Sequence, residues 1–168
     1  MACYTEIDSP IGPITLTASE AGLQSVWIQK TDKNRPALEG LTYDPAFLRE
    51  ASAQLSAYFN GELQCFELAI DARGGTAFQQ QVWQALTAIP FGQTASYSDI
   101  ARQISAPKAV RAVGAANGRN PIAIVVPCHR VVGADGSLTG YAGGLDNKRW
   151  LLAHEARFSQ GDLLTTTG

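Results

Sequence analysis

Ile122-Ala-Ile-Val-Val-Pro-Cys-His-Arg-Val-Val132 is the stretch on which the interpretation of this sequence depends. Its apolar residues before Pro127 predict a buried strand that ends at the proline and presents Cys128 beside His129 and Arg130. The thiolate is the nucleophilic form of cysteine, and an adjacent base or cation favours its formation. A helix beginning at Pro127-Cys128 would favour it too. Since a free cysteine is more often an inert core residue, the rest of the chain has to decide between the two interpretations.

The composition is that of an ordinary globular protein, with 168 residues, 45% hydrophobic and 17% charged. No apolar run is long enough to span a membrane, and the N-terminus lacks the features of a signal peptide. The three cysteines, Cys3, Cys65 and Cys128, form no CxxC pair. A sparse, odd set of cysteines suits a reducing compartment. We therefore expect a cytoplasmic protein without a disulfide framework.

The net charge of −2 is distributed unevenly. Residues 1–75 carry 5 Lys/Arg and 10 Asp/Glu, whereas residues 76–168 carry 8 and 5. No acidic residue lies between Asp99 and Asp135. The basic residues of that interval are Arg102, Lys108, Arg111, Arg119 and Arg130. Such a stripe is typical of a phosphate-binding surface, although five charges clustered by chance on a solvated surface explain it about equally well.

The pattern of elements predicts an α+β fold in two domains, residues 1–74 and 75–168. In the first, alternating residues predict strands over 11–18 and 23–28 joined by a turn. Residues 31–44 read as a loop, 45–60 as a helix and 65–70 as a third strand. The first domain is therefore expected to be a small sheet covered by one helix.

The second domain is predicted to be mostly helical. Its expected helices span residues 76–89, 96–104, 107–116 and 146–158. Thr76 and Gln79 form a capping box at the start of the first, and Asp146 is the expected N-cap of the last. The second and third are separated by a short break, which indicates a helix-turn-helix carrying Lys108 and Arg111.

Two further features bear on the chemistry. Glu155 on the last helix would suit the third position of a Cys-His-acid triad, in which a carboxylate orients the imidazole; an exposed helical acid is the commoner role. The glycine-rich stretch 133–144 contains Tyr141 and suits a loop that closes over a flat ligand such as an extruded base. A plain surface loop is the alternative.

These motifs together resemble those of the O6-alkylguanine-DNA alkyltransferases (methylated-DNA–protein-cysteine methyltransferases) of the small bacterial type. The motifs lie in family order at residues 76–83, 91–97, 111–117, 120–121, 127–132, 140–144 and 150–155. The first half of the chain matches weakly. The resemblance implies an N-terminal α/β domain with an RNase H-like sheet plus helix, followed by a winged helix-turn-helix domain. It also implies DNA repair by direct damage reversal.

The resemblance implies the following catalytic roles. Cys128 accepts the alkyl group from the O6 atom of a flipped guanine, or from O4-alkylthymine, and keeps it irreversibly as a thioether. His129 deprotonates Cys128 through a water, and Glu155 orients His129. Tyr97 donates to the leaving guanine, and Asn120 braces the turn before the cysteine.

The implied partner is double-stranded DNA containing O6-alkylguanine, bound through the minor groove by a monomer, with cooperativity along DNA left open. Arg111 would enter the base stack and replace the flipped nucleotide. The other expected DNA contacts are Lys108, Ala112, Gly114, Ser96 and Thr94. The expected pocket residues are Tyr141, Val131, Ala142 and Gly143.

The resemblance implies no cofactor. Some relatives hold a structural zinc through Cys and His, but the first half here has only Cys3 and Cys65 and no histidine, so no metal site is predicted. Cys65 is expected in the core, and Cys3 is expected to be a terminal bystander. Ala142 stands where some members have Ser, which removes one hydrogen bond from the expected pocket.

Three other functions are the alternatives. Alkyltransferase-like proteins bind damaged DNA without transfer, but they lack the acceptor cysteine that is present here as Cys128. A cysteine hydrolase would use the same Cys-His pair, but the sequence shows no oxyanion-hole signature and does carry a helix-turn-helix. A sequence-specific regulator would discriminate among undamaged duplexes.

Overall fold

The computed structural model describes residues 2–167, with side chains described through residue 159. The first half forms a four-stranded sheet of order β3-β2-β1-β4, in which β1, β2 and β3 are antiparallel neighbours and β4 pairs with β1 in parallel. The strands are β1 (Cys3–Ile7), β2 (Ile14–Ser19), β3 (Gly22–Ile28) and β4 (Thr42–Tyr43). The predicted β2 and β3 are confirmed, whereas β1 and the two-residue β4 were missed.

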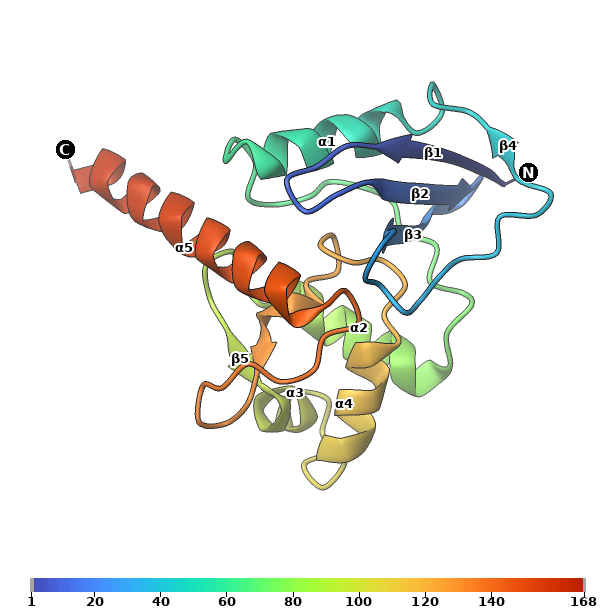
Figure 1. Cartoon of the computed structure of the whole chain (residues 1–168). Helices are drawn as coiled ribbons and strands as arrows, with labels where there is room; N and C mark the ends of the chain where they lie inside the picture. Colours follow the sequence, from blue (N-terminus) through green and yellow to red (C-terminus); the bar gives the residue numbers. More distant parts are fainter. Residues whose placement is uncertain (1, 168) are drawn as a thin grey trace.

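Helix α1 (Arg49–Phe59) covers one face of this sheet (Figure 1). Strand residues alternate between the two faces, so Leu16 lies on the face opposite to Thr17. Leu16 and Leu55 of α1 are completely buried in the core. On the other face the hydroxyls of Thr17 and Ser25 share a 2.6 Å hydrogen bond. This polar face is turned toward the second half of the chain.

The predicted strand over 65–70 is wrong. Ile70 makes an isolated bridge with Leu23, and the rest of the segment has no strand pairing. The edge of β3 pairs with two segments, because Val26 of the same strand bridges Ile122 from the second half. Of residues 65–70, Ile70 alone therefore pairs with the sheet, and the chain continues from there to the next helix.

The positions of two cysteines also differ from expectation. Cys3 is buried within β1, with 7% of its surface exposed, instead of being a terminal bystander. Cys65 lies exposed instead of in the core.

The second half contains four helices among the described residues. They are α2 (Ala77–Thr87), α3 (Tyr97–Gln103), α4 (Val110–Gly118) and α5 (Leu145–Thr167). The capping box of Thr76 and Gln79 is confirmed, and Ser96 with Asp99 forms another. The α3–turn–α4 arrangement confirms the predicted helix-turn-helix. The fold class is confirmed as α+β.

Two predicted helix starts are wrong. Helix α4 begins at Val110 instead of Pro107, because Ser105 has a φ of 61° and the residues after it form a turn before the helix. Asp146 lies within the first turn of α5 and is not its N-cap. Asp146 instead pairs with Arg149 at 2.8 Å.

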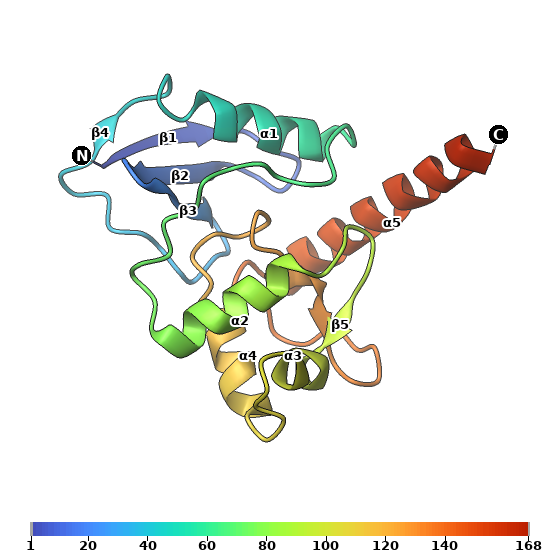
Figure 2. The same ribbon diagram turned by 180° about the vertical axis from the view of Figure 1, so that it is seen from behind.

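The two halves are in direct contact along one side of the sheet (Figure 2). The Val26 amide donates to the carbonyl of Pro121 at 3.0 Å, and the Ala123 amide donates to the carbonyl of Val26 at 3.3 Å. Helix α5 starts beneath the sheet and extends away from the body toward the C-terminus. No helix in the described residues is long and apolar enough to cross a membrane.

Candidate active site and DNA-binding surface

The segment before Cys128 is a series of turns, not the predicted strand. Residues 122–126 are all buried, and a uniformly apolar run does not by itself distinguish a strand from another buried segment. Ile124 has a φ of 73°, a conformation that is strained for a β-branched residue and is typical of functional sites. The Asn120 amide braces the segment, donating to the carbonyl of Val126 at 2.9 Å and accepting from the amide of Ile122 at 3.0 Å.

Cys128 begins a short 3-10 helix, η1 (Cys128–Arg130), which continues into β6 (Val131–Val132). Strand β6 pairs in parallel with β5 (Ala95–Ser96), so that Ser96 lies opposite Val132. Because α3 starts at the next residue, this strand pair brings Tyr97 close to the cysteine turn. Cys128 itself is buried, with 3% of its surface exposed.

The carboxylate of Glu155 is at the centre of a buried polar cluster. His129 Nε2 lies 2.7 Å from Oε2. Arg130 makes a two-pronged ion pair, from Nε to Oε1 at 2.8 Å and from Nη2 to Oε2 at 3.0 Å. The Tyr58 hydroxyl donates to Oε2 at 2.6 Å, and the Gly92 amide donates to Oε1 at 3.2 Å. The predicted contact between His129 and Glu155 is thus present.

The charges of this cluster fix the role of His129. Burial alone would raise the pKa of Glu155, but hydrogen bonds from His129 and Arg130 and the positive charge of Arg130 hold that pKa well below the ordinary value. Burial lowers the pKa of His129, so the imidazole is neutral at rest. Its Nε2 therefore carries the proton that Glu155 accepts. Nδ1 is left as the basic nitrogen, and it is buried without a partner among the described residues.

Cys128 is a thiol at rest, because burial raises its pKa to about 11. The expectation that Arg130 favours the thiolate directly is wrong. Its guanidinium faces Glu155 and donates from Nη1 to the carbonyl of Ile89 at 2.7 Å. Arg130 is itself buried, so it does not belong to the basic surface stripe that the sequence suggested. Formation of the thiolate therefore requires a base.

Of the residues expected to form the pocket, Tyr141 acts on the Cys128 thiol and Val131 directly follows the short helix that Cys128 begins. Val131, Tyr141 and Gly143 are buried, and Ala142 is partly buried. A side chain at Gly143 would meet the Tyr141 ring at 2.7 Å, so this glycine allows the loop to pack closely on the tyrosine. The Tyr97 hydroxyl shares a 2.7 Å hydrogen bond with Thr139 Oγ1 of the same loop.

Lys148, which no sequence motif indicated, connects the residues expected to form the pocket. Lys148 of α5 is completely buried, and its Nζ donates to the carbonyls of Val131 at 2.6 Å and Thr139 at 3.3 Å. Burial lowers its pKa. Lys148 thereby joins β6 to the glycine-rich loop.

The residues expected to contact DNA lie on α4, in the turn before it and in the segment before α3. Arg111, Ala112, Lys108 and Thr94 are exposed, and Gly114 and Ser96 are partly exposed. Gly114 lies close to Tyr97, since a Cβ there would be 3.8 Å from the tyrosine ring. The helix that carries Arg111 is therefore adjacent to the residue expected to meet the leaving base.

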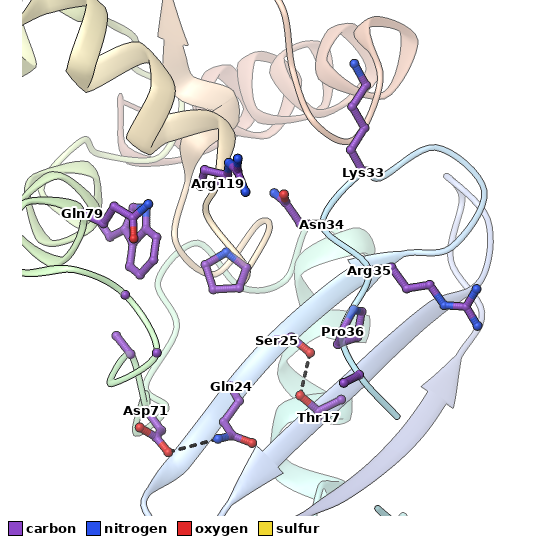
Figure 3. A pocket seen from close by; sticks show the side chains of 16 residues that line it. Thr17, Gln24, Ser25, Lys33, Asn34, Arg35, Pro36, Asp71, Gln79 and Arg119 are labelled. Carbon is purple, nitrogen blue, oxygen red and sulfur yellow. Dashed lines mark hydrogen bonds between the residues drawn. The ribbon is translucent and has the colours of Figure 1, made fainter. Parts of the chain in front are cut away.

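A groove of about 560 Å³ separates the polar face of the sheet from the second half. Figure 3 shows Ser25 and Gln24 of the sheet on one side, and Gln79 and Arg119 across from them. Asn34 lies between these sides, and its amide donates to the carbonyls of Gly118 at 2.9 Å and Asn120 at 3.1 Å. The loop after β3 thus supports the residue that braces the cysteine segment.

Two family models match the chain over most of its length. Residues 2–72 match the 6-O-methylguanine DNA methyltransferase, ribonuclease-like domain, and residues 77–157 match the DNA binding domain of the same family. The chain belongs to the 6-O-methylguanine DNA methyltransferase family. The relation suspected from the sequence motifs is thereby confirmed.

Methyltransferase relatives of high similarity include two proteins named methylated-DNA–protein-cysteine methyltransferase. The one from Methanosarcina acetivorans is 53% identical over 90% of this chain and 97% of its own length. The one from Mycobacterium tuberculosis is 52% identical over 97% of this chain and 98% of its own.

Solved structures of the family are also similar. The crystal structure of the Mycobacterium tuberculosis O6-methylguanine methyltransferase has a TM-score of 0.86 at 52% identity and covers 94% of both chains. A structure of the M. tuberculosis OGT protein in complex with DNA has a TM-score of 0.85 at 52% identity, covering 92% of this chain and 93% of that one.

Proposed function

We propose that this protein repairs DNA by moving the alkyl group of O6-alkylguanine onto Cys128. The observation that carries the proposal is the buried Cys128 beside His129, whose Nε2 is fixed by Glu155 and whose Nδ1 is unpartnered within the described residues. The bond between the alkyl carbon and O6 breaks as the bond to Sγ forms. The thiol proton passes through a bridging water to His129 Nδ1, and the leaving guanine takes up a proton from the Tyr97 hydroxyl, which regains one from solvent.

Each remaining group in the cluster has a chemical task in this reaction. Glu155 stabilises the imidazolium that forms on His129. Tyr97 acts as the donor to the guanine, which is a poor leaving group without a proton or hydrogen bond. Asn120 holds the cysteine turn in its strained conformation. Val131, Tyr141, Ala142 and Gly143 hold the extruded base.

The product fixes the type of enzyme. A thioether is not hydrolysed by ordinary water, so each chain acts once, as a methylated-DNA–[protein]-cysteine S-methyltransferase, and the reaction needs no cofactor. O4-alkylthymine is a second candidate substrate, because the same transfer to Cys128 would take the alkyl group from its O4 atom.

DNA is the partner, as the matching DNA-binding domain supports. We place α4 in the minor groove of a duplex with Arg111 in the gap left by the flipped guanine. The minor groove carries little sequence information, which suits a protein that must accept any sequence context. Lys108, Ala112, Gly114, Ser96 and Thr94 flank that contact. The protein binds DNA as a monomer. It consists of two domains, residues 1–74 and 75–168, and it acts in the cytoplasm.

The test is the number of lesions repaired per chain. With a duplex containing O6-methylguanine in excess, the protein should remove one methyl group per molecule. Cys128→Ala should remove none and bind the duplex with unchanged affinity. Many turnovers would indicate a hydrolase, and transfer by Cys128→Ala would contradict the proposed acceptor.

A further inference from the structure

Tyr58 is a residue of the first half of the chain that reaches the proposed catalytic cluster. It lies near the end of α1, is completely buried, and donates from its hydroxyl to Oε2 of Glu155 at 2.6 Å. His129 Nε2 contacts the same oxygen at 2.7 Å. Arg130 Nη2 donates to this oxygen as well, at 3.0 Å, so three donors share one carboxylate oxygen, and Tyr58 is the one that comes from the first half of the chain.

The Tyr58 ring is held in place on several sides. His154, the neighbour of Glu155 on α5, donates from Nε2 to the backbone carbonyl of Tyr58 at 2.7 Å, and its ring lies 5.1 Å from that of Tyr58. Phe66 and Phe91 pack against the tyrosine with ring centroids at 5.5 and 6.0 Å. Side chains packed in this way have little freedom to turn, so the hydroxyl is fixed toward Glu155.

We propose that Tyr58 is a positioning residue that sets the basicity of His129 by sharing Oε2 of Glu155. The inference rests on the proposed function, in which His129 is the base. A carboxylate oxygen that already accepts a short hydrogen bond from a phenol has less negative charge to offer a second donor. The hydroxyl also limits the positions that the carboxylate can take, and through it the direction of Nδ1.

The other charged groups around this pair are fixed and do not replace Tyr58. Arg130 of η1 binds both oxygens of Glu155, and Lys148 of α5 acts on His129 from the pocket side. His154 faces the backbone of Tyr58 instead of the carboxylate. Burial and the Glu155 charge raise the pKa of Tyr58 well above its ordinary value, so its hydroxyl remains a donor throughout the working pH range.

The experiment compares Tyr58→Phe with the unchanged protein in single-turnover methyl transfer across pH. The variant keeps the ring and removes the donor, so Glu155 should bind His129 more strongly and raise its pKa. The acid limb of the rate profile should move to higher pH. The rate at the acid end should fall about threefold or more, the change expected for one hydrogen bond, and the alkaline plateau should fall less. Tyr43→Phe is the matched control, because Tyr43 is 61% exposed.

A measurement without DNA separates this inference from the proposed function. The titration of His129, followed by NMR of its ring nitrogens, should move upward in Tyr58→Phe whether or not the protein transfers methyl groups. In the unchanged protein the Tyr58 hydroxyl proton should exchange slowly and lie close to the His129 Nε2 proton. The measurement of the Tyr58 hydroxyl proton uses the unchanged protein, so it tests the inference even if Tyr58→Phe does not fold.

Two outcomes would overturn the inference. One is a uniform loss of rate at every pH with the titration of His129 unchanged, which would make Tyr58 a packing residue. The other is a Tyr58 hydroxyl that exchanges freely in the unchanged protein. A protein that transfers no methyl group but shows the shifted titration would contradict the proposed function and leave the role of Tyr58 intact.

Discussion

A buried thiol that carries its own base distinguishes Cys128 from the reactive cysteines of many enzymes. Burial raises its pKa to about 11, so very little thiolate exists at neutral pH. Nucleophilicity depends on the thiolate, and the resting residue is therefore inert. In the proposed reaction, His129, whose Nε2 lies 2.7 Å from Glu155, is the base that removes the thiol proton. This arrangement suits a protein whose reactive group is used once.

The same cluster predicts a loss of stability in acid. His129 has a pKa lowered by burial, and Glu155 has one lowered by its partners. For both groups the unfolded chain binds protons more readily, so their contribution is present at neutral pH and is lost as pH falls. The free energy of unfolding should fall below the ordinary imidazole pKa of about 6.5, and further below the ordinary carboxyl pKa of about 4.3. Urea unfolding at successive pH values measures this.

Glu155→Gln tests the assignment of that loss. It leaves the buried Arg130 charge without its partner, which costs about 3–5 kcal/mol, and the acid-dependent part below the carboxyl pKa should shrink. Asp146→Asn on the same helix is the control, because its ion pair with Arg149 is exposed and such pairs contribute about 0–1 kcal/mol. An unchanged pH dependence in Glu155→Gln would contradict the account.

Sequence reasoning at this scale identified Cys128, His129, Glu155 and the bracing residue Asn120, but it did not find the contacts of Arg130, Tyr58 and Asn34 that hold this cluster. Arg130 was assigned to a phosphate-binding stripe, although its adjacency to His129 and its charge could have paired it with Glu155. Tyr58 lies 97 positions from its partner, and Asn34 lies 86 from Asn120. Contacts across such separations leave no local signal in one sequence.

At the scale of elements, local chemistry was a good guide where the side chain bonds the backbone directly. The capping boxes at Thr76 and Ser96 mark the observed starts of α2 and α3. Where no such cap exists the start was misplaced, as for α4, whose N-cap Ala109 makes no side-chain bond. The segment before Cys128 was mistaken for a strand because all its residues are buried. It bridges β3 at Ile122 alone, and the Asn120 side chain bonds the amide of Ile122 and the carbonyl of Val126.

Helix α4 yields a prediction on base extrusion. Arg111→Ala should weaken binding to an undamaged duplex only slightly, because it removes one contact among several. Transfer from O6-methylguanine should slow by about tenfold or more, since extrusion of a base costs a few kcal/mol. Single-turnover rates and the fluorescence of 2-aminopurine beside the lesion measure the two effects.

Arg102→Ala is the control for that experiment, because Arg102 is an exposed basic residue of α3 paired with Asp99. Equal losses of binding and transfer in Arg111→Ala would mean that Arg111 is an ordinary phosphate contact.

At the scale of the whole molecule, the site is built from both halves of the chain. Tyr58 of α1 binds Glu155 of α5, and Asn34 of the loop after β3 binds the carbonyl of Asn120. Backbone hydrogen bonds also join Val26 to the second half. The sequence motifs indicated chemistry in the second half alone, whereas Tyr58 and Asn34 show that the first half also contributes contacts to the site.

This coupling predicts that the protein unfolds as one cooperative unit. Separating the halves would expose a buried ion pair and an apolar interface, so neither half should melt alone. Calorimetry should give one transition whose calorimetric and van't Hoff enthalpies agree. Two resolved transitions would show that the halves are independent.

The central claim is that Cys128 takes the alkyl group from DNA, and mass spectrometry tests it most directly. The protein is mixed with a duplex containing one O6-methylguanine, its intact mass is measured, and its peptides are mapped. The account predicts a gain of one methyl group per chain, located on the peptide that contains Cys128. No gain in mass by a protein that still binds the lesion, or a methyl group on any other residue, would contradict it.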